Sequence, residues 1–171
     1  VTKVEMPTWT IRGGQDDVCW YNATKQREGV WKVTVPVSDH FFEGGYYITH
    51  VYVTANGTRT NDYGKYDTLV PDSSYIGITN LNREGFDVNY YTSRTNVSAA
   101  SIAVWTPYNG QDEIKWDAGT KVANRTYTIH VSVSDHLYEG GTYNVHAYAT
   151  VNVSSVYDSG NSAEEPNTDY Y

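Results

Sequence analysis

The chain of 171 residues has a formal net charge of −8, with 12 Lys and Arg against 20 Asp and Glu. Nucleic-acid binding and attraction to an anionic membrane surface are therefore disfavoured, because both need clustered basic residues. The single cysteine excludes an internal disulfide and a cysteine-based zinc site, and no apolar run reaches the roughly 18 residues of a membrane-spanning helix.

Aromatic residues are unusually frequent for so polar a chain. It has 17 Tyr and 5 Trp beside 3 Phe, with a mean hydropathy of −0.58. Tyr, Trp and β-branched residues favour strands, and Tyr and Trp bury area while keeping one polar end in water. The composition therefore predicts β structure with half-exposed aromatic faces.

An internal repeat organises the chain. The segment WTIRGGQDDVCWYNATK begins at Trp9 and recurs as WTPYNGQDEIKWDAGTK at Trp105, and the offset of 96 residues continues without a gap to Asn56 and Asn152. Of these 48 aligned pairs, 21 are identical. Two copies of one structural unit follow from this similarity.

The two copies differ in completeness. Strand-like patterning precedes Trp105, whereas only eight residues precede Trp9, so the first copy lacks roughly 25 residues at its front. We expect an incomplete first repeat over residues 1–71, a second over 72–158, and an acidic linker or tail over 159–171. Either the sequence begins within a domain, or the strands that complete the first copy come from elsewhere, through domain–domain contacts or strand swapping with a partner chain.

In chain order, the first predicted strands of the two copies are Asp16–Tyr21 and Asp112–Trp116, which follow Gly-containing turns. Val33–Val37 and Ile129–Val133 alternate β-branched with other residues, which is typical of a strand with one buried face. Tyr75–Thr79, Phe86–Tyr91 and Ser101–Trp105 show strand patterning ahead of the second copy's core motif.

The next strands are Gly45–Thr54 and Gly141–Thr150, both opened by a Gly-Gly pair. Asn56-Gly57 then predicts a tight hairpin turn. The second copy has Asn152-Val153 at this point, so we expect its turn to differ.

Short strands separated by turn signals predict an all-β fold of tandem immunoglobulin-like β-sandwiches, the first truncated at its N-terminus. Glu43–Tyr47 and Glu139–Tyr143 fit the acid-x-Gly-x-Tyr spacing of a tyrosine corner, in which the ring packs inward and the hydroxyl binds backbone. Burial is expected at Trp20, Trp116, Val35, Val131, Tyr47 and Tyr143, with Trp9 and Trp105 as the alternative core tryptophans.

Candidate catalytic and metal-binding residues are few. His40 with Asp39, Glu43 and His50 recurs in the second copy, and His and carboxylates bind zinc, but the spacing matches no zinc signature. We therefore favour a turn held by hydrogen bonds. Cys19 has Lys115 as its counterpart, so the shared unit does not use it as a nucleophile. No catalytic residue, metal, cofactor or enzyme activity is expected.

A candidate binding surface follows from strand parity. His50 and Tyr52 share one face, and His146 and Tyr148 share the equivalent face. Tyr47 has the opposite parity and is assigned to the core. These His–Tyr faces are a candidate ligand-binding surface, with Tyr21 and Trp31 as further candidates. We favour the alternative, that another strand or the neighbouring unit covers this face, because residues retained in both copies more often serve packing than binding.

The strings GQDDVCWYNATK and VSDHFFEGGYYITHVYVTANG, with their second copies, resemble the GBS Bsp-like repeat of streptococcal secreted proteins. The resemblance covers nearly the whole chain except the tail. It implies a non-catalytic, extracellular module that binds peptidoglycan or a wall glycopolymer and holds a secreted murein hydrolase, or autolysin, on the cell wall. Asp117 departs from the family pattern, in which Tyr is usual.

A second interpretation is an immunoglobulin-like stalk or adhesin spacer that projects another domain. A clustered aromatic surface repeated in both units would favour binding, whereas aromatic residues confined to the cores would favour the stalk.

Overall fold

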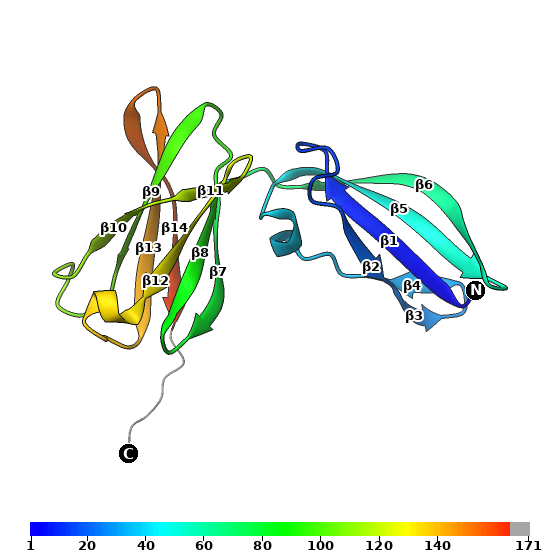
Figure 1. Cartoon of the computed structure of the whole chain (residues 1–171), viewed down its shortest axis with the longest axis horizontal. Helices are drawn as coiled ribbons and strands as arrows, with labels where there is room; N and C mark the ends of the chain where they lie inside the picture. Colours follow the sequence, from blue (N-terminus) through cyan, green and yellow to red (C-terminus); the bar gives the residue numbers. More distant parts are fainter. Residues whose placement is uncertain (165–171) are drawn as a thin grey trace, which may run out of the picture. The chain divides into compact units, whose positions relative to one another are not determined.

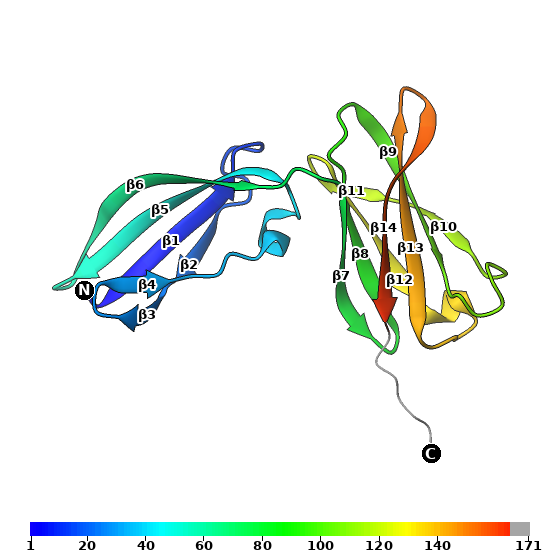
Figure 2. The same cartoon turned by 180° about the vertical axis from the view of Figure 1, so that it is seen from behind.

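The computed structural model describes residues 1–164, apart from the side chains of residues 62–64. It is all-β, with two short 3₁₀ helices among the described residues, η1 (Val37–His40) and η2 (Val133–His136). The chain divides into two compact units, Val1–Asp72 and Ser73–Tyr171, drawn in Figures 1 and 2. No helix among the described residues is long and apolar enough to cross a membrane.

Unit 2 is a complete immunoglobulin-like sandwich of two four-stranded sheets, ordered β10-β9-β13-β14 and β11-β12-β8-β7. Alternate residues of both sheets point inward and form one core, which includes Phe86, Val88, Ile102, Val104 and Val145. The strands are β7 (Tyr75–Asn82), β8 (Gly85–Tyr91), β9 (Val97–Trp105), β10 (Lys115–Ala118), β11 (Thr120–Ala123), β12 (Thr126–Ser132), β13 (Thr142–Val151) and β14 (Ser154–Glu164).

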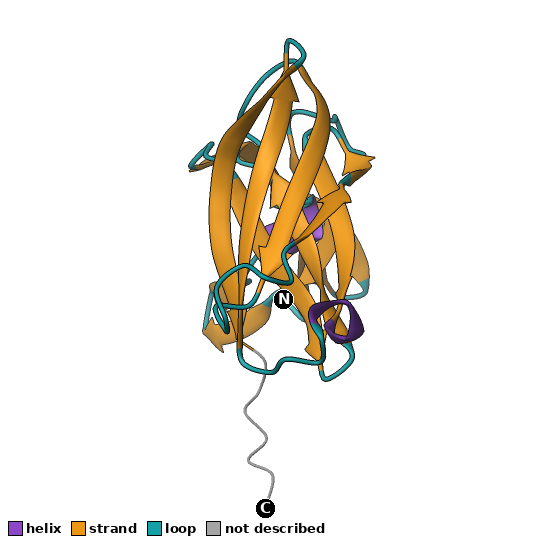
Figure 3. Ribbon diagram, turned by 90° about the vertical axis from the view of Figure 1, so that its left-hand side faces the viewer, coloured by secondary structure: helices purple, strands orange, loops and turns teal. Residues whose placement is uncertain are grey.

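Unit 1 has one four-stranded sheet, ordered β2-β1-β5-β6, and a separate hairpin, β3-β4. The hairpin residue Trp31 and the sheet residues Val4, Val51 and Val53 line a pocket of about 280 Å³ on the inner face of that sheet. In place of a second four-stranded sheet, the described residues of this unit form the hairpin labelled β3 and β4 in Figure 1. Figure 3 colours the strands orange and the 3₁₀ helices purple. The strands are β1 (Lys3–Thr10), β2 (Cys19–Asn22), β3 (Thr24–Arg27), β4 (Val30–Lys32), β5 (Gly45–Ala55) and β6 (Thr58–Val70).

The predicted strand Val33–Val37 does not form. Strand β4 ends at Lys32, and residues 33–36 have no regular secondary structure. In unit 2, strand β12 over the equivalent residues pairs with β8 along its length. No counterpart of β8 is present among the described residues of unit 1, so the same valine pattern has no partner strand. Val35 is accordingly half-buried rather than buried, while Val131 is buried as expected.

Two strand boundaries and the tail also differ from expectation. Residues 16–17 and 112–113 lie in turns, and the strands begin at Cys19 and Lys115, because the side chains of Asp17 and Glu113 accept hydrogen bonds from the backbone N–H groups of Thr10 and Thr106. Strand β14 continues to Glu164 and pairs with β13, so residues 159–164 are not a linker. Residues 165–171 lie outside the described residues.

The tyrosine corners are present in both units. The hydroxyl of Tyr47 donates to the carbonyl oxygen of Glu43 at 2.7 Å, and the hydroxyl of Tyr143 donates to the carbonyl of Glu139. Both rings are buried, as the spacing predicts.

Candidate functional site

The outer face of the β10-β9-β13-β14 sheet of unit 2 carries a continuous row of aromatic rings. Tyr148 lies between Trp116, at 5.1 Å between ring centroids, and Tyr157, at 5.5 Å. His146 extends the row, at 5.1 Å from Tyr157 and 4.7 Å from Trp105. The row therefore crosses all four strands of the sheet.

Strand pairing places these rings on the outer face. Trp116 and His146 both pair with Ala103, from either side, and the next residue along, Val104, belongs to the core. Because neighbouring residues of a strand point to opposite faces, the row points away from the core.

Unit 1 repeats the central part of this arrangement. The rings of Trp20 and Tyr52 lie 5.2 Å apart at an interplanar angle of 41°, against 5.1 Å and 46° for Trp116 and Tyr148. His50 packs against Trp9 at 4.8 Å, as His146 packs against Trp105. The four predicted residues His50, Tyr52, His146 and Tyr148 therefore lie beside tryptophans on equivalent outer faces.

The expectation that Trp20 and Trp116 are buried is wrong. Their exposed fractions are 49% and 53%, whereas Trp9 and Trp105 are buried at 7% and 9%. Trp20 and Trp116 project from the edge strands β2 and β10 onto the outer face, which none of the sheets in residues 1–164 covers. An exposed tryptophan at the same position of both units is a surface feature that packing does not explain.

The two outer faces differ in what accompanies the Trp–Tyr pair. In unit 1 the guanidinium carbon of Arg59 lies 4.5 Å from the ring centroid of Trp20 and 4.8 Å from that of Tyr52. This cation–π contact covers part of both rings. The counterpart of Arg59 in unit 2 is Ser155, and there Tyr157 adds a half-exposed ring instead.

The other two predicted residues lie elsewhere. Tyr21 pairs with Met6 on the inner side of the sheet, and its hydroxyl contacts Asp39 and His40 Nε2, both at 3.0 Å. Trp31 lines the inner-face pocket of unit 1. Tyr21 does not join the outer aromatic face because it has the opposite strand parity to Trp20. Trp31 does not join it because it belongs to the hairpin.

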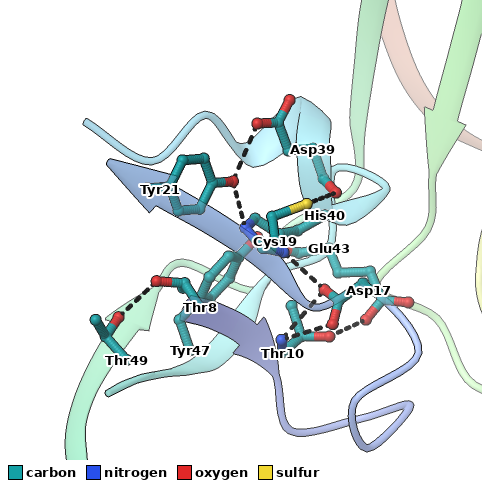
Figure 4. A network of polar contacts seen from close by, with 10 residues as sticks. All are labelled: Thr8, Thr10, Asp17, Cys19, Tyr21, Asp39, His40, Glu43, Tyr47 and Thr49. Carbon is teal, nitrogen blue, oxygen red and sulfur yellow. Dashed lines mark hydrogen bonds and ion pairs between the residues drawn. The ribbon is translucent and has the colours of Figure 1, made fainter. Parts of the chain in front are cut away.

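Figure 4 shows the polar network around His40. His40 is fully buried and its Nδ1 lies 2.9 Å from the carboxylate of Asp17. The same carboxylate accepts the backbone N–H of Thr10 at 3.0 Å, and the hydroxyl of Thr10 donates to Glu43 at 3.1 Å. Burial raises the pKa of the Glu43 carboxyl above its ordinary value, despite the hydrogen bond from Thr10.

Unit 2 repeats this network with Glu113 in place of Asp17. His136 Nδ1 and the N–H of Thr106 both contact the Glu113 carboxylate. Burial opposes ionisation of Glu113, but these hydrogen bonds outweigh it and hold the pKa of Glu113 below its ordinary value. The network ties the loop after β1 to the 3₁₀ turn η1 in unit 1, and the loop after β9 to η2 in unit 2, which is the turn-stabilising role favoured for His40.

The other residues considered for metal binding and covalent chemistry near this network are His50 and Cys19. His50 packs on Trp9 rather than joining His40, and no cluster of three His, Cys, Asp or Glu side chains suited to a metal ion occurs within residues 1–164. The thiol of Cys19 lies 3.8 Å from the carbonyl oxygen of Asp39.

Sequence reasoning missed three participants. Arg59 and Tyr157 come from β6 and β14, outside the 48 pairs that identify the repeat. Asp17, the third, pairs with His40 as Glu113 pairs with His136. The sequence signal for this contact was that an acidic residue and a histidine occur at the same two positions of both copies.

Comparison with known proteins gives one family. The model described as GBS Bsp-like repeat matches residues 1–68 and 76–162. No curated protein matches the chain in sequence.

Similar solved structures share only low sequence identity. BC0361, a polysaccharide deacetylase from Bacillus cereus, is 9% identical over 54% of this chain and 30% of that chain, with a TM-score of 0.48. The FN1–FN3 domains of chicken CNTN1 are 11% identical over 96% and 56%, with a TM-score of 0.41. Domains A168–A170 of titin are 12% identical over 93% and 53%, with a TM-score of 0.34. The chain thus spans between 30% and 56% of those chains.

Proposed function

Because the chain belongs to the GBS Bsp-like repeat family and is a tandem, non-catalytic repeat module, we propose that it binds the glycan of a bacterial cell wall. Peptidoglycan or an attached glycopolymer is the ligand. In this role it is extracellular and holds a secreted murein hydrolase, with a catalytic domain outside this chain, on the wall.

One observation carries the proposal. An exposed Trp and a neighbouring Tyr form a tilted pair on the outer sheet face of both units, with ring separations of 5.2 and 5.1 Å. Exposed aromatic pairs that serve neither core favour a binding module over a spacer.

The chemistry of these faces suits sugars. The apolar face of a pyranose ring stacks on Trp and Tyr rings, and the Tyr hydroxyls and His nitrogens bind sugar hydroxyls. A long glycan presents many equivalent sugars, so binding by one unit raises the effective concentration for the other. Weak contacts at each unit then give firm attachment of the whole chain.

Sedimentation of the purified chain with streptococcal sacculi tests the proposal, before and after chemical removal of wall polymers. We expect the chain to sediment with the sacculi. The double variant Trp20→Ala, Trp116→Ala should no longer sediment with them. The matched control is Tyr138→Ala, which removes a ring that is 77% exposed in a loop.

Circular dichroism verifies that each variant is folded. Retention after removal of wall polymers identifies peptidoglycan as the ligand, whereas loss identifies the polymer. Unchanged sedimentation of the folded double variant contradicts binding through these faces, and no sedimentation of the native chain favours the stalk or spacer.

A further inference from the structure

A pocket of about 230 Å³ at one end of the unit 2 sandwich is lined by three cationic side chains, Arg94, Lys121 and Arg125. Only five Lys or Arg occur in residues 73–171, against eleven Asp or Glu. None of the described residues that line the pocket is acidic, and the remaining lining residues are Thr95, Asn96, Val97, Asn124 and Tyr127. Basic charge is therefore gathered at one place in an acidic unit.

The two arginines are held in place by their surroundings. Arg94 Nε donates to the carboxylate of Asp158, whose side chain is nearly buried and also accepts from Ser74 and Thr92. Burial opposes ionisation of Asp158, but these hydrogen bonds outweigh burial and hold the pKa of its carboxyl below the ordinary value. An ionised Asp158 thus fixes one edge of the Arg94 guanidinium.

Arg125 is fixed through its backbone as well as its side chain. Its carbonyl oxygen accepts the N–H of Thr92 at 3.0 Å, and its Nη1 donates to the carbonyl oxygen of Ser93 at 3.2 Å. Its φ of +115° is a conformation that non-glycine residues rarely adopt. The loop before β9 and the turn between β11 and β12 are therefore joined, and both contribute cations to one pocket.

The equivalent place in unit 1 lacks this charge. Lys25, the counterpart of Lys121, forms an ion pair with Glu28 at 2.8 Å. Glu28 and Gly29 stand where unit 2 has Asn124 and Arg125. Lys121 has no carboxylate partner in unit 2 among the described ion pairs. The charge is thus a property of unit 2 and not of the shared fold.

We propose that this pocket binds a phosphate group. Three cations supplied by two separate segments can approach the oxygens of a tetrahedral anion from different directions, whereas a planar carboxylate is satisfied by a single guanidinium fork. The amides of Asn96 and Asn124 provide neutral donors at the same pocket. Arg94, Lys121 and Asn124 are exposed, so the pocket has room for a phosphate group that is part of a longer chain, and we assign the phosphate to a phosphodiester polymer.

This inference does not depend on the outer aromatic faces. It is tested on the ¹⁵N-labelled full chain with two probes, inorganic phosphate and poly(glycerol phosphate), at low ionic strength. We expect both probes to shift the amide resonances of residues 94–97 and 121–127, and to leave those of residues 25–31 unmoved.

The variants separate a specific site from general charge. Lys121→Gln and Arg125→Gln should each weaken binding of poly(glycerol phosphate) by about tenfold, as expected for the loss of one charge-assisted hydrogen bond. Lys25→Gln, the matched change in unit 1, should leave it unaltered, and Trp116→Ala should retain the shifts.

The Lys121 side chain is exposed and forms no hydrogen bond or ion pair among the described residues, so its variant tests the site without disturbing the fold. Equal weakening by Lys25→Gln, or shifts spread over both units, would overturn the proposal. Binding of inorganic phosphate without the polymer would overturn the polymeric source. An unmoved spectrum with both probes would remove the pocket altogether.

Discussion

Val153 occupies in its hairpin turn the position that Gly57 occupies 96 residues earlier, and both have a left-handed backbone, with φ of +65° and +77°. The preceding residues, Asn56 and Asn152, are also left-handed. The expectation of a different turn in the second copy is therefore wrong. Unit 2 keeps the twisted two-residue turn of unit 1 with a β-branched residue where glycine is favoured.

Val153→Gly should raise the free energy of unfolding of unit 2 by about 1 kcal/mol, because it relieves the clash between Cβ and the carbonyl oxygen. The side chain is 98% exposed, so no packing is lost. Gly57→Val should lower the stability of unit 1 by a similar amount. Urea unfolding followed by resolved amide resonances of each unit measures both, and an unchanged midpoint for Val153→Gly contradicts the strain.

Tyr148→Ala should weaken binding to sacculi more than Tyr52→Ala does. Tyr148 links Trp116 and Tyr157 in an uncovered row, whereas Arg59 lies over Tyr52 and its tryptophan. The loss of one stacked ring corresponds to about 1 kcal/mol or a few-fold in the dissociation constant. Sedimentation isotherms of the two variants with sacculi compare their dissociation constants. If the Arg59 guanidinium causes the difference between them, the same comparison in an Arg59→Ala background should give a smaller difference.

Ile102→Ala should destabilise unit 2 by about 3 kcal/mol, since Ile102 is fully buried in the sandwich core. Its counterpart Met6 is half-buried, and Met6→Ala should lower the stability of unit 1 by only about 1 kcal/mol. The comparison uses the same unit-resolved unfolding measurement. Equal losses would indicate that the inner face of the unit 1 sheet is as well covered as that of unit 2.

Tyr47→Phe and Tyr143→Phe should each lower the stability of their own unit by about 1 kcal/mol, the net value of one hydrogen bond. Each hydroxyl donates to a carbonyl oxygen four residues earlier, and the ring is retained in the variant. Tyr46→Phe, at a 54% exposed neighbouring position, is the control and should leave stability unaltered.

Acidification should affect the two units differently. The pKa of Glu113 is lowered in the folded state from its ordinary 4.5, so its contribution is present above pH 4.5 and is lost as the pH falls through the lowered value. The pKa of Glu43 is raised, so its contribution is greatest below pH 4.5 and is lost as the pH rises through the raised value.

Between pH 5 and 3, Glu113 therefore removes stability from unit 2 while protonation of Glu43 favours unit 1. The direction of the two pKa shifts sets this pH range. Urea unfolding, followed separately for each unit across the range, measures the change in the free energy of unfolding. Glu113→Gln should reduce the pH dependence of unit 2 without removing it, because the pKa of Asp158 is also lowered. A unit 2 that gains stability on acidification would contradict the assignment.

Local motifs predicted much of this molecule. The repeat, the all-β fold and the tyrosine corners at Tyr47 and Tyr143 follow from spacing alone, because each depends on residues close in sequence. Strand parity likewise placed His50 and Tyr52 together on one face.

Features that depend on distant partners were not predictable. Parity shows which residues share a face but not which face is covered, so exposed Trp20 was assigned to the core. The pattern of Val33–Val37 requires a neighbouring strand that only unit 2 has. Arg59 and Tyr157 reach the aromatic faces through pairing of β6 and β14, which no local pattern encodes.

Asp158 has a mechanical consequence for unit 2. It accepts a hydrogen bond at 2.5 Å from Ser74, 84 residues earlier, and Asn161 Nδ2 donates to the carbonyl oxygen of Ile76 at 2.7 Å. The first and last strands of the unit are thereby joined. When the polypeptide is pulled, the load reaches unit 2 through these two strands, so the hydrogen bonds between them must break before the core is exposed. The mechanical strength of the unit is therefore set by contacts between β7 and β14 and not by the core.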